Sequence, residues 1–111
     1  MSDLPVLDKP SALSRLMNNE ALYNKLIHIF IEQVSNLPPF QADINNVSSD
    51  LLLAVHSLKG SAGEIGASAL HGELTRVEHR MKYEPEELTD SDFQQVNEQI
   101  ARLLDVIDPH R

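Results

Sequence analysis

The feature that most constrains the fold is the spacing of the hydrophobic residues, which recur every three or four positions along most of the chain. In the C-terminal segment LTDSDFQQVNEQIARLLDVI this spacing produces one apolar stripe along a helix. Its members are Phe93, Val96, Ile100, Leu103, Leu104 and Ile107. A second stripe consists of Leu70, Leu74, Val77 and Met81. No segment shows the sustained alternation of apolar and polar residues that indicates a half-buried strand. The chain is therefore predicted to be all-α.

Capping and helix-breaking residues divide the first half of the chain into helices. A short helix follows Asp8 and ends at Asn18, and Asn19 caps a second helix. The predicted core residues of the second helix are Leu22, Leu26, Ile29, Phe30, Val34 and Leu37. Pro38 and Pro39 bend or end it, because proline removes a backbone donor and crowds the preceding turn. A helical segment that carries Phe40 and Ile44 is expected beyond the bend.

Similar signals predict three further helices. Ser48 or Ser49 caps the third helix, with Asp50 in its first turn, and Gly66 ends it. The fourth runs from Ser68 to Pro85, and cap residues at 89–92 open the last one. Short loops place sequential helices side by side. We therefore expect an antiparallel up-and-down four-helix bundle with a short extra N-terminal helix, in a single domain over residues 1–111.

Composition excludes several classes of function. The chain has 9 Lys and Arg against 17 Asp and Glu, a net charge of −8, which disfavours nucleic acid as a partner. It has no cysteine, and therefore neither disulfides nor thiolate chemistry. We expect no membrane association, because no apolar stretch approaches the roughly 20 residues of a membrane span. The N-terminus does not resemble a signal peptide, so a cytoplasmic location is expected. The acidic surface favours a monomer, as does the lack of a second long apolar stripe in addition to those predicted to form the core.

The segment LLLAVHSLKGSAGEIGA, residues 51–67, combines a helical pattern with three glycines and a histidine. A glycine inside a helix costs about 1 kcal/mol relative to alanine, so these glycines need a reason. At about 100° per residue, the predicted core stripe lies almost opposite His56. That stripe consists of Leu51, Val55, Leu58, Ala62 and Ile65. His56 is therefore expected to face solvent.

The residues around His56 predict a surface for another macromolecule. Lys59, Gly60 and Gly63 fall on the same side of the helix, and the two glycines leave that side without side chains. Leu52 and Leu53 flank the same exposed face, where apolar residues indicate an interaction site. We call Leu52, Leu53, Gly60 and Gly63 the predicted docking face. The alternative for both glycines is close packing between helices.

The chemistry available to an exposed imidazole is that of a base, a metal ligand or a nucleophile. A general base needs an orienting carboxylate and a pocket, and a convex helix face is expected to supply neither. A metal site is disfavoured, because the positions three and four residues after His56 hold Lys59 and Gly60. Phosphoryl acceptance fits better, since Lys59 can contact phosphoryl oxygens and the glycines allow close approach of a donor. The sequence has no nucleotide-binding loop, so it is not expected to be an ATP-dependent kinase.

The run HSLKGSAGEIGASAL, residues 56–70, resembles the signature of histidine-containing phosphotransfer (HPt) domains. The segment ALSRLMNNEALYNKLIHIFIEQ, residues 12–33, is similar to the opening helices of the same family. The chain departs from the family pattern at MNNE, where glycines are frequent, and at Pro38–Pro39.

This resemblance implies a bundle that carries a phosphoryl group as phosphohistidine in a two-component phosphorelay. It implies that His56 is the phosphoacceptor, that Lys59 stabilises the phosphoryl group and that Gly60 makes room for the partner. The implied partners are receiver domains of response regulators or a hybrid sensor histidine kinase. The chain is expected to need no cofactor or metal of its own, because the receiver supplies Mg²⁺.

Two rival hypotheses remain. In the first, the same bundle is a non-catalytic module that docks through Leu52, Leu53, Gly60 and Gly63 while His56 is chemically idle. In the second, His71, His79 and nearby glutamates bind a metal.

Overall fold

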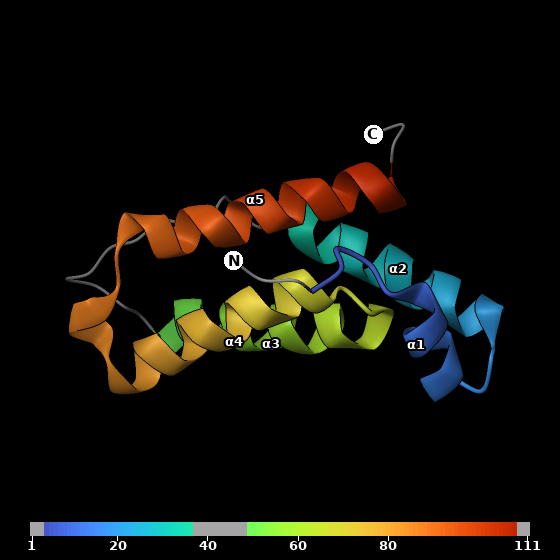
Figure 1. The fold of residues 1–111 in the computed structure, drawn as a ribbon, viewed down its shortest axis with the longest axis horizontal. Coiled ribbons are helices and arrows are strands. Elements are labelled where there is room, and N and C mark those ends of the chain that lie inside the picture. The colour runs from blue at the N-terminus through green and yellow to red at the C-terminus, as the bar shows by residue number, and fades with distance from the viewer. Residues whose placement is uncertain (1–3, 37–48, 109–111) are drawn as a thin grey trace.

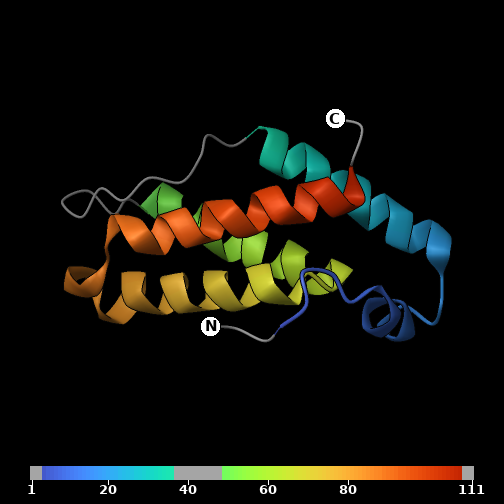
Figure 2. The same cartoon turned by 45° about the horizontal axis from the view of Figure 1, so that its top comes forward.

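The computed structural model describes residues 4–36 and 49–108, and all regular structure in these ranges is helical. The elements are α1 (Lys9–Arg15), α2 (Glu20–Ser35), α3 (Ser49–Ile65), α4 (Ser68–Tyr83), the 3₁₀ helix η1 (Pro85–Glu87) and α5 (Asp90–Ile107). Helices α3, α4 and α5 run along the long axis in alternating directions, and α1 lies at one end (Figure 1). A second view shows α5 crossing in front of α3, with α2 at the end opposite η1 (Figure 2). The expected all-α bundle with a short extra N-terminal helix is confirmed.

Capping residues set the helix boundaries as the sequence predicted. The Oδ1 atoms of Asp8 and Asn19 each accept a hydrogen bond from the backbone amide three residues later, at 3.3 and 3.0 Å. Thr89 and Asp92 form a reciprocal capping box at the start of α5. These contacts satisfy backbone donors that the first turn of each helix leaves free.

Gly66 ends α3 with a φ of +83°, a conformation that favours glycine. A Cβ atom at this position would also overlap the backbone carbonyl of Asp8. The amide of Asp8 donates to the carbonyl of Gly66 at 2.7 Å, and the amide of Ala69 donates to that of Pro5 at 2.9 Å. The segment before α1 is thereby held against the turn between α3 and α4.

The loop between α1 and α2 lies where the chain departs from the family pattern. Met17 and Asn18 have φ values of 56° and 61°, in the left-handed region that glycine adopts most readily. Asparagine tolerates this region, whereas a methionine there is strained. The glycines that the family often has in this loop would suit both positions.

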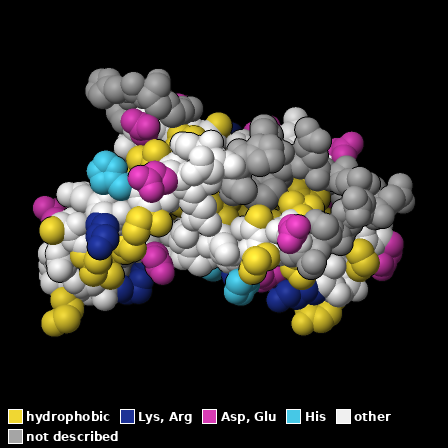
Figure 3. All heavy atoms as spheres, turned by 180° about the vertical axis from the view of Figure 1, so that it is seen from behind, with side chains coloured by type: hydrophobic (Ala, Val, Ile, Leu, Met, Phe, Trp, Pro, Cys, Tyr) yellow, Lys and Arg dark blue, Asp and Glu magenta, His cyan; other side chains and the backbone are white. Residues whose placement is uncertain are grey.

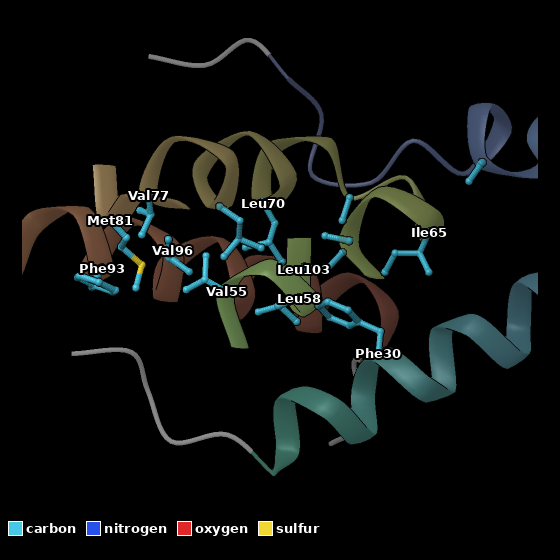
Figure 4. Packing of buried hydrophobic residues seen from close by; sticks show 14 of the residues in the cluster. Phe30, Val55, Leu58, Ile65, Leu70, Val77, Met81, Phe93, Val96 and Leu103 are labelled. Atoms are coloured by element: carbon cyan, nitrogen blue, oxygen red, sulfur yellow. The ribbon is translucent and has the colours of Figure 1, made fainter. Parts of the chain in front are cut away.

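The core lies between α3, α4 and α5, with contributions from α1 and α2 (Figure 4). Four of the five predicted core residues of α3 are buried, and Leu51 is partly buried. The predicted stripe of α4 is buried throughout, as are Phe93, Val96 and Leu103 of α5. The periodicity of the sequence therefore identified the inner faces of these three helices.

The predicted stripe of α2 is partly wrong. Phe30 is buried and Leu26 and Val34 pack against the core as predicted. Leu22 and Ile29 are exposed, and Tyr23, which was not predicted, is buried. The Tyr23 hydroxyl donates to the carbonyl of Ile65 at 2.9 Å, which fixes this orientation of α2. Leu37, Pro38, Pro39, Phe40, Ile44 and the possible cap Ser48 lie outside the described residues.

A charged cluster that the sequence did not predict joins α4 to the start of α5. Asp92 is nearly buried and accepts hydrogen bonds from Arg76 and, at 3.1 Å, from Arg80. Burial alone would raise the pKa of Asp92, but the hydrogen bonds from Arg76 and the Thr89 amide hold that pKa below its ordinary value. The cluster therefore stabilises the contact between the two helices only while Asp92 is ionised.

Candidate functional site

His56 stands on the outer face of α3, as the sequence predicted. Its side chain is 60% exposed, while Val55 and Leu58 on either side of it are buried in the core. The surrounding turns of α3 are regular helix, so the imidazole is held by a rigid element. The ring is open to a partner from the solvent side.

The main feature of the site that the sequence did not predict is Glu78 of α4. Its carboxylate is only 7% exposed, and Oε2 lies 2.6 Å from Nδ1 of His56. Oε1 accepts a hydrogen bond of the same length from Nζ of Lys59. The expectation that this face provides no orienting carboxylate is therefore wrong, because the neighbouring helix supplies one.

Glu78 is ionised in this environment. Burial alone would raise the pKa of its carboxyl group, but the hydrogen bonds from Lys59 and His56 hold the pKa below its ordinary value. An ionised carboxylate can only accept hydrogen bonds, so Nδ1 of His56 must carry the proton in this pair. In the neutral ring the proton-free nitrogen is then Nε2, which is the atom able to act as a nucleophile.

A groove of about 300 Å³ lies beside the imidazole. We call it the His56 groove, and its lining residues are Leu52, Leu53, His56, Glu78 and Lys82. Leu53 is 64% exposed, so one side of the groove is an exposed apolar surface of the kind found at interaction sites. The two leucines of the predicted docking face therefore lie next to the histidine, together with a lysine that the sequence did not single out.

The two glycines of the predicted docking face differ. A Cβ atom on Gly60 would meet no heavy atom within 4 Å beyond its chain neighbours and the nearby backbone of its own helix, so this side of α3 is open beside Lys59. A Cβ atom on Gly63 would lie 3.2 Å from Cδ2 of His71 on α4. Gly63 also accepts a hydrogen bond from Arg15 at its carbonyl. The expected open surface is therefore limited to Gly60, while Gly63 packs against side chains of α1 and α4.

The two histidines of the metal hypothesis, His71 and His79, lie near opposite ends of α4. His79 packs against Tyr83 with the rings tilted and their centroids 5.0 Å apart, and its Nε2 is 3.7 Å from Glu84. His71 is at the other end of α4, against Gly63. Within the described ranges, no group of three or more histidine and carboxylate residues is placed to hold a metal ion.

Exposed hydrophobic side chains lie beside basic ones near both ends of the face in Figure 3. The exposed large hydrophobic residues of the described chain are Leu4, Met17, Leu22, Ile29, Leu53, Tyr83 and Val106. None of the helices in the described part of the chain has the length and apolar character needed to cross a bilayer.

Comparison with known proteins assigns the chain to a family. The sequence model of the Hpt domain matches residues 20–106, which include α2, α3, α4 and all of α5 except its last residue. The chain belongs to the Hpt domain family. No curated protein and no solved structure matches it significantly. Domains of this family are phosphocarriers that act by histidine phosphotransfer in phosphorelays and interact with receiver domains.

Proposed function

We propose that this protein is the phosphocarrier of a two-component phosphorelay and that Nε2 of His56 carries the phosphoryl group. The observation that supports this most directly is the 2.6 Å contact of Nδ1 with Glu78, which leaves Nε2 proton-free at an exposed position. A group that must attack phosphorus in line with a leaving oxygen needs both properties.

In the proposed reaction, Nε2 attacks the phosphorus of an aspartyl phosphate on a receiver domain. The Nε2–P bond forms, the P–O bond to the aspartate breaks, and the electron pair of that bond remains on the carboxylate. The imidazole then carries a positive charge, with its proton still on Nδ1 and facing Glu78. The ionised carboxylate stabilises this cation, and the reverse steps deliver the phosphoryl group to a second receiver.

The surroundings of His56 suit the approach of such a partner. Gly60 leaves one side of α3 open, and Leu52 and Leu53 offer an apolar surface on the groove side. In this structure Lys59 donates to Glu78, and we expect it to turn toward the phosphoryl oxygens after transfer. We expect Mg²⁺ to be bound by the receiver and this chain to act as a monomer.

The test is to incubate the purified protein with a phosphorylated receiver domain or with a hybrid kinase and ATP. Wild type should acquire phosphate that is labile in acid and stable in base, and His56→Gln should acquire none. His71→Gln and His79→Gln are matched controls at exposed histidines of α4 and should be labelled like wild type. Labelling that survives in His56→Gln would place the phosphoryl group on another residue and overturn the proposal. Unchanged partner affinity and wild-type pathway output from His56→Gln would favour the docking module instead.

A further inference from the structure

Two lysines as well as His56 lie close to the carboxylate of Glu78. Lys59 donates to Oε1 at 2.6 Å and is only 24% exposed, so it is committed to Glu78 in this state. A second lysine, Lys82, lies one turn after Glu78 on α4, with Nζ 4.0 Å from Oε2. Lys82 is 41% exposed and lines the His56 groove. It is therefore close to the carboxylate without making a hydrogen bond to it.

After phosphorylation of His56, the phosphoryl group and the Glu78 carboxylate would compete for the ammonium group of Lys59. A phosphoryl group brings between one and two negative charges to Nε2 and requires a cation nearby. Turning the Lys59 ammonium toward the phosphoryl group weakens its contact with Oε1, so the nearly buried carboxylate keeps His56 at Oε2 but loses its close partner at Oε1. A nearly buried carboxylate oxygen that loses its hydrogen-bond partner is unfavourable. The site therefore needs a second cation when it is phosphorylated.

We propose that Lys82 is this cation: in the phosphorylated state it closes onto Glu78 and releases Lys59 to the phosphoryl oxygens. This rests on the proposed function, because it describes the same histidine after transfer. Lys82 is in this sense a positioning residue that acts through Glu78. The charged groups that face His56 in the described part of the chain are Lys59 on α3 and Glu78 and Lys82 on α4. In the proposed exchange, Lys82 replaces Lys59 as the partner of Glu78.

The experiment uses the whole chain labelled with phosphoramidate, which needs no partner protein. The Nε2–P bond forms as the P–N bond of phosphoramidate breaks, and ammonia leaves. The phosphorus resonance of the product, followed by NMR against pH, reports the pH at which the phosphoryl group takes its second negative charge. A nearby cation lowers this midpoint.

We expect Lys82→Gln to raise the midpoint by about half a pH unit, because Lys59 then stays on Glu78. Lys25→Gln, at an exposed position of α2 outside the groove, is the matched control and should leave it unchanged. In a Glu78→Gln background no carboxylate competes for Lys59, so adding Lys82→Gln should produce no further shift. Melting curves of the unphosphorylated variants check that each is folded.

The outcomes separate the two proposals. A wild-type protein that is not labelled at His56 would overturn both. Labelling at His56 with the same midpoint in wild type and Lys82→Gln would overturn the role of Lys82 alone. A shift that persists fully in the Glu78→Gln background would show that Lys82 contacts the phosphoryl group directly, which contradicts the exchange proposed here.

Discussion

Nδ1 of His56 and Oε2 of Glu78 lie 2.6 Å apart, although the two residues are on different helices. The imidazole is exposed and the carboxylate is nearly buried, so the pair connects the outer surface of α3 to the interior contact with α4. Because Glu78 also holds Lys59, one buried group orients both side chains that the proposed reaction uses.

Replacement of Glu78 should act first on the tautomer of His56. Glu78→Gln retains an oxygen acceptor for Nδ1–H, so the proton should stay on Nδ1. Glu78→Ala removes the acceptor, and the preference for this tautomer should be lost. Nitrogen NMR of the neutral imidazole measures the two forms. We expect phosphoryl transfer to Glu78→Ala to fall at least tenfold, and less to Glu78→Gln. Equal tautomer populations in wild type and Glu78→Ala would contradict this role.

Replacement of Lys59 should affect both transfer and folding. A lysine on an open surface contributes little to stability, but Lys59 is largely covered and pairs with a buried carboxylate. Lys59→Ala should therefore lower the free energy of unfolding by about 1–2 kcal/mol as well as slow transfer. In a Glu78→Gln background the stability loss should shrink, because the unpaired charge is gone. Urea unfolding of the four variants in this cycle checks the coupling.

The parts of the fold that could be predicted depend on contacts within about four residues. Asp8, Asn19 and Gly66 mark helix ends through interactions with their own turns, which a sequence displays directly. Two members of the predicted α2 stripe, Leu22 and Ile29, were wrong because apolar residues occupy both candidate faces of this helix. The choice is made by a contact with Ile65, which is 42 positions from Tyr23.

For the candidate site, too, the sequence revealed the features set by local contacts but not those set by distant ones. The spacing of the α3 stripe was sufficient to place His56 outside the core. Its partner Glu78 is 22 positions away, and only the packing of α3 on α4 brings them together. One sequence signal was present: Glu78 lies four residues after Leu74 and next to Val77, within the apolar face of α4. A carboxylate at such a position indicates a buried charge that needs partners, although it does not identify them.

The glycines at the C-terminal end of α3 should differ in their response to alanine. Gly60→Ala adds a methyl group into open space in a helix interior, so it should raise the free energy of unfolding by about 0.5–1 kcal/mol. Gly66→Ala forces a side chain into a left-handed conformation and against the carbonyl of Asp8. It should lower stability by about 2 kcal/mol or more.

A larger side chain at Gly60 separates stability from access. Gly60→Gln should fold at least as well as wild type but block phosphoryl transfer from a receiver domain, because its side chain occupies the space beside His56. Labelling by the small donor phosphoramidate should be nearly unaffected. Loss of folding in a thermal melt would instead indicate that Gly60 is a packing residue.

The cluster around Asp92 should make the protein sensitive to acid. The pKa of Asp92 is lower in the folded state than in the unfolded chain, where it is near 4. The unfolded state therefore binds protons more readily, so this contribution to stability is complete above the unfolded pKa and is lost as the pH falls through the folded one. The pKa of Glu78 is shifted in the same direction.

Asp92→Asn should lower the free energy of unfolding at pH 7 by about 2–4 kcal/mol, because Arg76 and Arg80 lose their shared partner. Its melting temperature should also change less than that of wild type between pH 6 and about pH 3. Ser91→Asn, at the neighbouring exposed position, is the matched control. Parallel pH profiles for wild type and Asp92→Asn would mean that the acid sensitivity comes from other carboxylates.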